Sequence, residues 1–339
     1  MRTSPAIFIS LMLLSGTAIA RDEGVAPPLP DLTSFDLMRG DSGNAPAYVT
    51  VAQAADELKN YDVIFLGEWH DHAGNHLAEM HLFREIYAHA PQLALSMEQF
   101  ERDVQPVVDD YMAGRIGEEA LQRKGRAWGN YAEAYRPLVE FAKDHHLPVI
   151  AANTPASVVR CVGEKGPEFL SQLDAEKRHW AATDLHLADG PYKDKFMRFL
   201  AEDATHGAPA SAADAAASNA RAFAAQVVRD DTMAESIALY LQRNPGHKVV
   251  HITGDFHVEG RLGTVERLKD RMPALKIAVV VPVEAENPNR PAVAAADAKG
   301  GDFFFLMRGE PKEYANDAEK KAAEEQIRGN FRTRAQCRL

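Results

Sequence analysis

Six short runs of apolar residues recur along the chain, and they constrain its fold more than any other feature. The runs cover residues 62–66, 92–97, 148–152, 248–253, 276–283 and 302–307. They are apolar throughout, which is typical of strands covered on both faces, and helical patterns separate them. This alternation predicts an α/β fold with a mainly parallel sheet, flanked by helices and joined by right-handed crossovers.

The segments between the runs show where helices begin and where extra structure is inserted. Thr50 and Gln53 form a capping-box pattern that predicts a helix to about residue 59. Residues 75–89 carry apolar side chains at helical spacing, and Pro137 suits the first turn of a helix to about residue 145. The gap between the third and fourth runs is much longer than one crossover needs. We therefore expect a helical insertion over residues 155–245, packed beside the sheet.

The two ends of the chain differ from its centre. Residues 1–20 have the pattern of a signal peptide, with Arg2, a short apolar core and the small residues Ala18 and Ala20 before the cleavage point. The apolar core is too short to span a membrane, and no transmembrane segment is expected later. The pattern predicts a periplasmic or secreted protein. We expect an extended lead-in over residues 21–49, an α/β domain over 50–310 and a charged tail, a loosely held helix, over 311–339.

Charge and cysteine content exclude several classes of protein. The formal net charge of -11 disfavours nucleic acid as a partner. Two cysteines, Cys161 and Cys337, are too few for a disulfide framework, and neither lies in a C-x-x-C pattern. That excludes covalent c-type haem attachment and thiol-redox chemistry. Because Cys337 lies in the charged tail, we expect the two cysteines to remain unpaired.

Polar residues directly follow each of the first four apolar runs. The carboxyl ends of neighbouring parallel strands open onto one crevice, where ligands bind. The sequence therefore predicts that side chains far apart in number converge on one pocket. The set is Glu68, His70, Glu98, Asn153, Asp255 and His257.

The pattern Gly-x-x-His occurs after two different runs, at 67–70 and 254–257, where we expect the glycine to permit a tight turn. Two imidazoles with two carboxylates suit a divalent metal ion, with His70, His257 and Glu98 as ligands, or acid–base chemistry that also uses Glu68. The alternative is a set of structural turn histidines with capping carboxylates. His76 lies on the apolar face of its helix, either as a ligand or as a core histidine. His251, inside a strand run, is predicted to be structural.

At these residues the chain resembles the ChaN family of haem-binding uptake proteins, in the superfamily that also holds Tiki proteases and erythromycin esterase. Two departures stand out. The chain has no lipobox cysteine, so it should be free of a lipid anchor, and Thr264-Val265 follows Gly263 where the family has Val-Pro. The matching pieces are Gly67-Glu68-x-His70-Asp71, Met97-Glu98-x-Phe100-x-Arg102-x-x-Gln105, Trp128, Tyr135-Arg136-Pro137, Asn153-x-Pro155, Ala225-Gln226-x-x-x-Asp230-x-x-Met233-Ala234 and Gly254-x-x-His257 with Gly260 and Gly263.

The resemblance implies an α/β core with a helical side domain and non-covalent haem binding, linked to iron acquisition across a bacterial envelope. It also implies tyrosine and histidine contacts to haem, in a homodimer. A haem site needs an apolar slot and a Tyr, His or Met at the iron. The alternative function is a metal-dependent hydrolase, with Glu68 or Glu98 as general base and His70 and His257 as metal ligands or acid–base partners. A scaffold with a vestigial crevice is the third option. The candidate haem contacts are Tyr131, Tyr135, Tyr192, His186, His206, His76 and Asn153.

Overall fold

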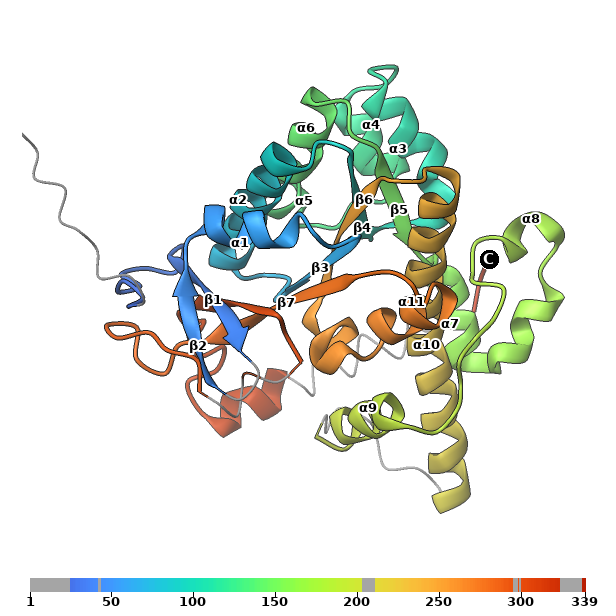
Figure 1. The fold of residues 1–339 in the computed structure, drawn as a ribbon. Coiled ribbons are helices and arrows are strands. Elements are labelled where there is room, and N and C mark those ends of the chain that lie inside the picture. The colour runs from blue at the N-terminus through green and yellow to red at the C-terminus, as the bar shows by residue number, and fades with distance from the viewer. Residues whose placement is uncertain (1–24, 42–43, 203–210, 295–297, 299, 324–336) are drawn as a thin grey trace, which may run out of the picture.

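A computed structural model describes residues 25–41, 44–202, 211–294, 298, 300–323 and 337–339. Its eight strands form one sheet in the order β2-β1-β8-β7-β3-β6-β4-β5 (Figure 1). The six strands from β8 to β5 are parallel, which confirms the predicted fold class. Each predicted run begins within one residue of an observed strand. The strands are β1 (Phe35–Asp41), β2 (Asn44–Val49), β3 (Val63–Glu68), β4 (Leu93–Glu101), β5 (Val149–Asn153), β6 (Lys248–Gly254), β7 (Ile277–Glu284) and β8 (Phe303–Met307).

The helices confirm the predicted start signals. Thr50 caps the first helix, its side chain accepting from the Gln53 amide while the Gln53 side chain accepts from the Thr50 amide. Pro137 lies in the first turn of α6. The α-helices are α1 (Val51–Leu58), α2 (Ala73–His89), α3 (Gln105–Met112), α4 (Glu118–Lys124), α5 (Tyr131–Ala134), α6 (Arg136–Asp144), α7 (Ala156–Lys165), α8 (Ala175–Arg178), α9 (Pro191–Glu202), α10 (Ala212–Arg243) and α11 (Thr264–Arg271). The short 3-10 helices are η1 (Arg102–Val104), η2 (Pro167–Gln172), η3 (Asp255–His257) and η4 (Glu259–Arg261).

Helices cover both faces of the sheet. In β3, Ile64 and Leu66 pack into the core shared with α1, α2 and α6, whereas Val63 and Phe65 pack into the opposite core with α10 and α11 (Figure 1). Successive side chains of a strand point to opposite faces, so a strand covered on both sides must be apolar at every position. This explains why the six runs do not alternate.

The direction of chain winding reverses between β3 and β6, which are neighbours in the sheet. From β3 the chain crosses by α2 to β4, on one face of the sheet, and from β6 it crosses back by α11 to β7, on the other face. Such a reversal separates the connections at the carboxyl ends of the two strands and leaves a crevice there. Both Gly-x-x-His patterns lie at this point.

The prediction of an extended lead-in over residues 21–49 has to be corrected, because part of this segment forms the hairpin β1–β2. β1 pairs antiparallel with β8 and with β2, so the segment extends the sheet. Leu37 and Met38 are buried in it. Pro46 is tolerated because it lies in β2, the edge strand, where a proline breaks no ladder bond inside the sheet.

The helical insertion is confirmed, and α10 ties it to the sheet. The C-terminal half of α10 packs Met233 and Ile237 into the core on the sheet. Its N-terminal half packs Phe223 and Val227 against Tyr192 and Phe196 of α9. One helix therefore serves both as the crossover onto β6 and as the support of the insertion.

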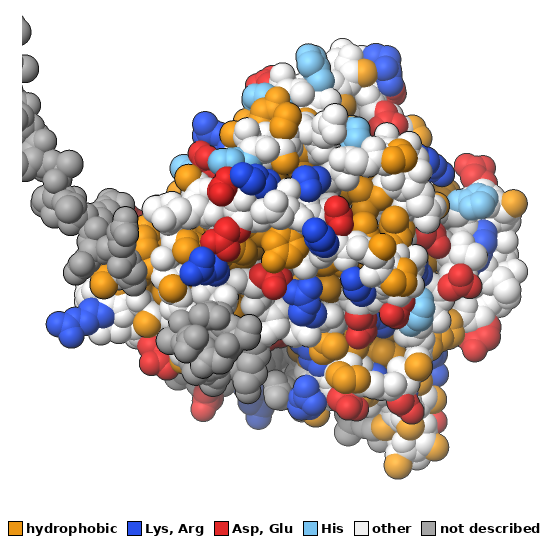
Figure 2. Space-filling view, in the orientation of Figure 1, with side chains coloured by type: hydrophobic (Ala, Val, Ile, Leu, Met, Phe, Trp, Pro, Cys, Tyr) orange, Lys and Arg blue, Asp and Glu red, His pale blue; other side chains and the backbone are white. Residues whose placement is uncertain are grey.

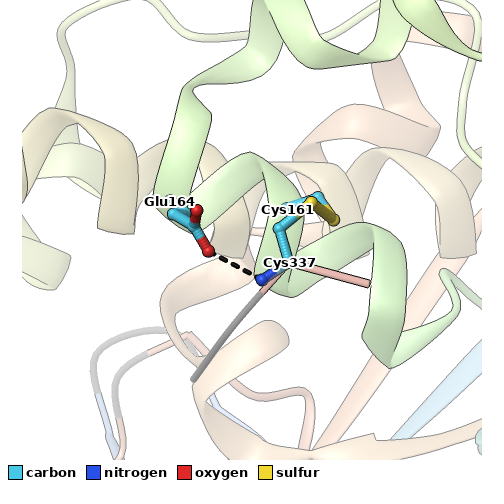
Figure 3. The surroundings of a disulfide bond; sticks show 3 residues. All are labelled: Cys161, Glu164 and Cys337. Atoms are coloured by element: carbon cyan, nitrogen blue, oxygen red, sulfur yellow. Dashed lines mark hydrogen bonds between the residues drawn. A yellow bond between two sulfur atoms is a disulfide. The ribbon is translucent and has the colours of Figure 1, made fainter. Parts of the chain in front are cut away.

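The expectation that the cysteines remain unpaired is wrong, because Cys161 of α7 and Cys337 form a disulfide (Figure 3). The Cys337 amide also donates to Glu164, at 2.7 Å. The bond fastens the end of the chain to the insertion. Local sequence gave no sign of it, since 176 positions separate the two residues. Within the tail, residues 317–323 are helical, and the signal-peptide prediction lies outside the described residues.

Reduction of this disulfide is expected to destabilise the protein. Closing so long a loop restricts the unfolded chain, and loss of such a bond costs about 2–5 kcal/mol. For a protein of this size that corresponds to a fall in Tm of roughly 5 °C. Calorimetry of Cys337→Ser beside the wild type, with and without reductant, checks this. The prediction would be contradicted if neither the Cys337→Ser substitution nor the reductant lowered the Tm. Reductant should not change the Tm of Cys337→Ser, which has no disulfide to reduce.

The face of the molecule seen in Figure 2 carries acidic and basic side chains interspersed, without a single large basic area. None of the helices in the described residues is long and apolar enough to cross a membrane.

Candidate functional site

The side chains after β3, β4 and β6 meet at the reversal point of the sheet, as predicted. Glu98 is central: its Oε2 accepts from the Gly254 amide at 2.9 Å and from the Thr253 hydroxyl at 2.6 Å. The Oε1 atom of Glu98 lies 3.5 Å from Nε2 of His257. His70 reaches the same place, since its imidazole stands directly over Gly254.

Gly67 and Gly254 are needed because other side chains pack closely against them, and less for the tight turn that we expected. Neither has a positive φ, and Gly254 has a φ of -51° that any residue can adopt. A Cβ on Gly254 would lie 2.8 Å from Nε2 of His70, and a Cβ on Gly67 would lie 2.9 Å from the Val258 side chain. A side chain at 254 would therefore displace the histidine that belongs to the other motif.

His70 is oriented by a buried carboxylate. Its Nδ1 lies 2.6 Å from Oε1 of Glu68, which also accepts from Gln99 at 2.9 Å and from the Tyr135 hydroxyl at 2.7 Å. The His70 side chain is 42% exposed while that of Glu68 is buried. Burial lowers the pKa of His70, but the Glu68 hydrogen bond and the Glu98 charge outweigh it, and the pKa is raised. Trp128 packs edge-on against the ring.

His257 is oriented in the same way by Asp230 of α10. Its Nδ1 lies 2.8 Å from Oδ1 of Asp230, which also accepts from Thr264 at 2.9 Å, while Oδ2 accepts from Tyr192 at 2.6 Å. Burial lowers the pKa of His257, yet the charges of Asp230 and Glu98 raise it overall. Thr264, which stands where the family has valine, thus supplies a hydroxyl that donates to Asp230.

Glu98 lies between these two histidine–carboxylate pairs. Burial would raise its pKa, but His257 and His70, with the Thr253 and Gly254 hydrogen bonds, lower it to about 2. The crevice therefore holds an ionised carboxylate between two imidazoles whose Nδ1 atoms are both occupied. This arrangement suits acid–base chemistry by the Nε2 atoms.

Asp230 was not among our predicted site residues, although it lies in one of the pieces that match the family, from Ala225 to Ala234. It comes from a helix and not from the end of a strand, so the strand-end argument did not include it. Asp255, which we did include, accepts from the Trp69 indole at 3.0 Å. Burial raises the pKa of Asp255.

The three candidate tyrosines all lie in the interior. The hydroxyls of Tyr135 and Tyr192 donate to Glu68 and Asp230, and the buried Tyr131 hydroxyl has no hydrogen-bond partner among the described residues. Asn153 is also buried and accepts from the Thr154 amide. His186 is partly exposed and bound to Asp231, and His206 lies outside the described residues. These positions leave His70 as the exposed imidazole of the crevice.

Beside His70 is a pocket of about 330 Å³ between α2 and the α5–α6 region. Leu77, Met80, Ala134 and Pro137 supply apolar walls. Leu77 is 40% exposed, which is unusual for a large apolar side chain in the described part of the protein. The other lining residues are Thr33, His70, Asp71, Ala73, His76, Asn130 and Glu133.

The predicted metal ligands His70, Glu98 and His257 are not the most compact set. Among the described residues, one group of three places a ligand atom from each within 4.8 Å of the others, and it consists of Glu68, His76 and Glu79. Burial and the neighbouring Glu68 raise the pKa of Glu79 well above its usual value. Binding of one ion by the predicted set needs side-chain movement.

Other residues of the matching pieces support the scaffold. The Gln105 side chain donates to the Val149 carbonyl and accepts from the Ala151 amide, so it pairs with the edge strand β5 as a neighbouring strand would. Arg102 binds Ser236, Glu235 and the Thr232 carbonyl, which fastens the end of β4 to α10. His251 is buried against Ser96, which confirms its structural role.

The fold and the two histidine–carboxylate pairs define an α/β protein with a polar crevice at its sheet reversal point. The chain belongs to the family described as "Haem-binding uptake, Tiki superfamily, ChaN", whose model matches residues 54–268. That stretch contains both Gly-x-x-His motifs, Glu98 and Asp230, and it confirms the resemblance drawn from the sequence.

Solved structures and a curated relative are similar to the chain. ChaN of Campylobacter jejuni, described as binding haem cofacially, has a TM-score of 0.60 and 15% identity, covering 83% of this chain and 100% of that one. Erythromycin esterase EreC has a TM-score of 0.42 and 14% identity over 80% of this chain and 82% of that one, too distant to carry an argument. The chloroplastic RETICULATA-RELATED 5 of Arabidopsis thaliana is 26% identical over 219 residues, which is 62% of this chain and 29% of that protein.

Proposed function

We propose that this protein binds haem in the pocket beside His70 and carries it in the bacterial envelope as part of iron acquisition. The observation that carries the proposal is an exposed imidazole, oriented by a buried carboxylate, at the edge of an apolar pocket in a chain of a haem-binding uptake family. Haem iron in proteins accepts such an imidazole, and a carboxylate on Nδ1 fixes the ring and raises its basicity.

The residues of the pocket fit part of a porphyrin. Leu77, Met80 and Pro137 offer apolar contact, and Nε2 of His70 is the nitrogen that Glu68 leaves free. When bound, haem would supply the iron whose coordination His70 completes. A volume of 330 Å³ is near the lower end for ligand pockets, roughly 300–1,000 Å³. Much of the ring would remain uncovered, and a second copy of the chain is the partner that we propose covers it, in line with the cofacial binding described for Campylobacter jejuni ChaN.

Export to the periplasm is part of the proposal. The N-terminal pattern of residues 1–20 is that of a cleaved signal peptide. The disulfide between Cys161 and Cys337 supports an oxidising compartment, because such bonds form and persist outside the cytosol.

Hemin titration tests the haem site directly. Purified protein mixed with hemin is expected to develop a sharpened Soret band, and His70→Ala should weaken hemin binding at least tenfold and shift the band, because the iron loses its proposed ligand. His81→Ala is the control, since His81 is an exposed histidine on α2. A flat titration of the wild type would sink the proposal. Equal spectra for wild type and His70→Ala would exclude His70 as the ligand.

The Leu77→Asp variant tests the contribution of the pocket wall to hemin binding independently of the proposed iron ligand, His70. A charge on this exposed wall should lower hemin affinity without changing the band of the protein that still binds, because His70 is untouched. Unchanged affinity in this variant would place the haem elsewhere.

A metal-dependent hydrolase is the second candidate, favoured by the two histidine–carboxylate pairs on either side of Glu98. In that function Glu98 or Glu68 would act as general base, and the Nε2 atoms of His70 and His257 would bind the ion or transfer protons. Metal analysis of the purified protein, followed by assays of chromogenic esters with manganese, cobalt and zinc, tests it. Absence of turnover above buffer with every ion would reject it for this substrate class.

A further inference from the structure

Behind the crevice, three buried side chains turn potential metal-ligand atoms toward one another. They are Glu68 at the end of β3 and His76 and Glu79 on α2, with exposures of 1%, 9% and 0%. Nδ1 of His76 lies 3.7 Å from Oε2 of Glu68 and 3.2 Å from Oε2 of Glu79. An ion with bonds of 2.0–2.2 Å in tetrahedral geometry has ligand atoms about 3.4 Å apart. The two distances from His76 bracket this value, and all three ligand atoms lie within 4.8 Å of one another, so the cluster has room for one ion.

The surrounding hydrogen bonds orient each group toward the centre of the cluster. Nε2 of His76 lies 2.8 Å from the His70 carbonyl, which can only accept, so this nitrogen carries the proton and Nδ1 is left with its lone pair. Glu68 receives its three donors on Oε1, and Glu79 receives Asn75 on Oε1 at 2.9 Å. The other oxygen of each carboxylate faces His76.

One atom of the cluster lacks a hydrogen-bond partner within the part of the chain that the structure describes. It is the buried Oε2 of Glu68, whose neighbour Nδ1 of His76 lies 3.7 Å away. A buried carboxylate oxygen left unpaired is costly, and a cation beside it removes that cost. The bond from a histidine to a backbone carbonyl through its second nitrogen is also the usual support of a metal-ligating imidazole.

We propose that Glu68, His76 and Glu79 form a binding site for one divalent first-row transition-metal ion, behind the crevice and sharing Glu68 with it. Two carboxylates balance the charge of the ion, and the imidazole favours transition metals over magnesium or calcium. His76 also lines the 330 Å³ pocket, which gives the ion an approach from solvent. Because Glu68 holds His70 through its other oxygen, the ion would stiffen the histidine that faces the crevice.

Zinc titration by calorimetry, without hemin, tests the site. The wild type is expected to bind one zinc ion in the cluster, and Glu79→Gln should weaken that binding at least tenfold while keeping the Asn75 contact through its amide oxygen. Glu85→Gln is the matched control, because it makes the same substitution on α2 at a position outside the cluster. Circular dichroism confirms folding, and His76→Gln provides a second variant.

Cobalt absorption gives an independent readout, since a four-coordinate ion has a strong visible spectrum that Glu79→Gln should lose. The proposal is overturned if Glu79→Gln and His76→Gln bind zinc as the wild type does. It is also overturned if binding is lost only in His257→Ala, which would place the ion in the crevice, or if no ion binds, which would leave a proton as the occupant of the cluster. None of these outcomes depends on hemin binding.

Discussion

Replacing Asp230 by alanine is expected to lower the free energy of unfolding by about 3–5 kcal/mol, the usual cost of removing one partner of a buried charge pair. The carboxylate is fully buried and accepts from His257, Thr264 and Tyr192. Without it, three buried donors lose their acceptor at once. The Arg267 guanidinium, which lies over the Tyr192 ring, also loses a compensating charge.

Urea denaturation of three variants checks this result. Asp230→Asn retains one acceptor oxygen but no charge, so it should lower the free energy of unfolding by a smaller amount, about 2 kcal/mol. Gln242→Ala, at an exposed position of α10, should stay within about 0.5 kcal/mol of the wild type. If Asp230→Ala were within 1 kcal/mol of the wild type, the network would not be the structural centre that its contacts indicate.

Much of the fold was predictable because its signal is local. A strand covered on both faces must be apolar at each position, as Val63 to Leu66 are, and the first polar residue after it marks the sheet edge. The hairpin β1–β2 lacks that signal. Arg39 is exposed, and Gly40 and Pro46 are typical of loops, so only pairing with β8 makes the segment a strand.

The candidate site was predictable only where its residues follow strands. Glu68, Glu98 and His257 were placed correctly because parallel strands end at one edge. Asp230 and Glu79 come from helices, and the face that such a helix turns to the sheet end depends on packing that no short pattern shows. For the same reason the direction of the Tyr135 hydroxyl, toward Glu68 and away from solvent, could not be read from the sequence.

Glu98→Gln is expected to remove one large contribution to the acid dependence of stability. The pKa of Glu98 falls from an ordinary 4.5 to about 2 in the folded protein. A folded-state pKa below that of the unfolded chain contributes stability that is complete above the unfolded value and is lost as the pH falls toward the folded value. The window is thus about pH 4.5 down to 2, and the contribution is on the order of 3 kcal/mol.

The two histidines act in the opposite direction. The pKa values of His70 and His257 are raised in the folded protein, so their contribution is complete below the ordinary 6.5 and is lost as the pH rises through the folded values. These three groups together therefore contribute most stability between about pH 4.5 and 6.5, where Glu98 is ionised and both imidazoles are protonated.

Urea denaturation at pH 7, 5 and 3 separates these contributions. Glu98→Gln should be less stable than the wild type by about 3 kcal/mol at pH 5, and the difference should shrink toward pH 3 as the wild type loses the same interaction. Glu119→Gln, an exposed carboxylate paired with Arg123, should change stability by less than about 0.5 kcal/mol at every pH. A difference between Glu98→Gln and the wild type that stayed constant from pH 5 to pH 3 would show that the carboxylate is held by packing and not by the charge of the two histidines.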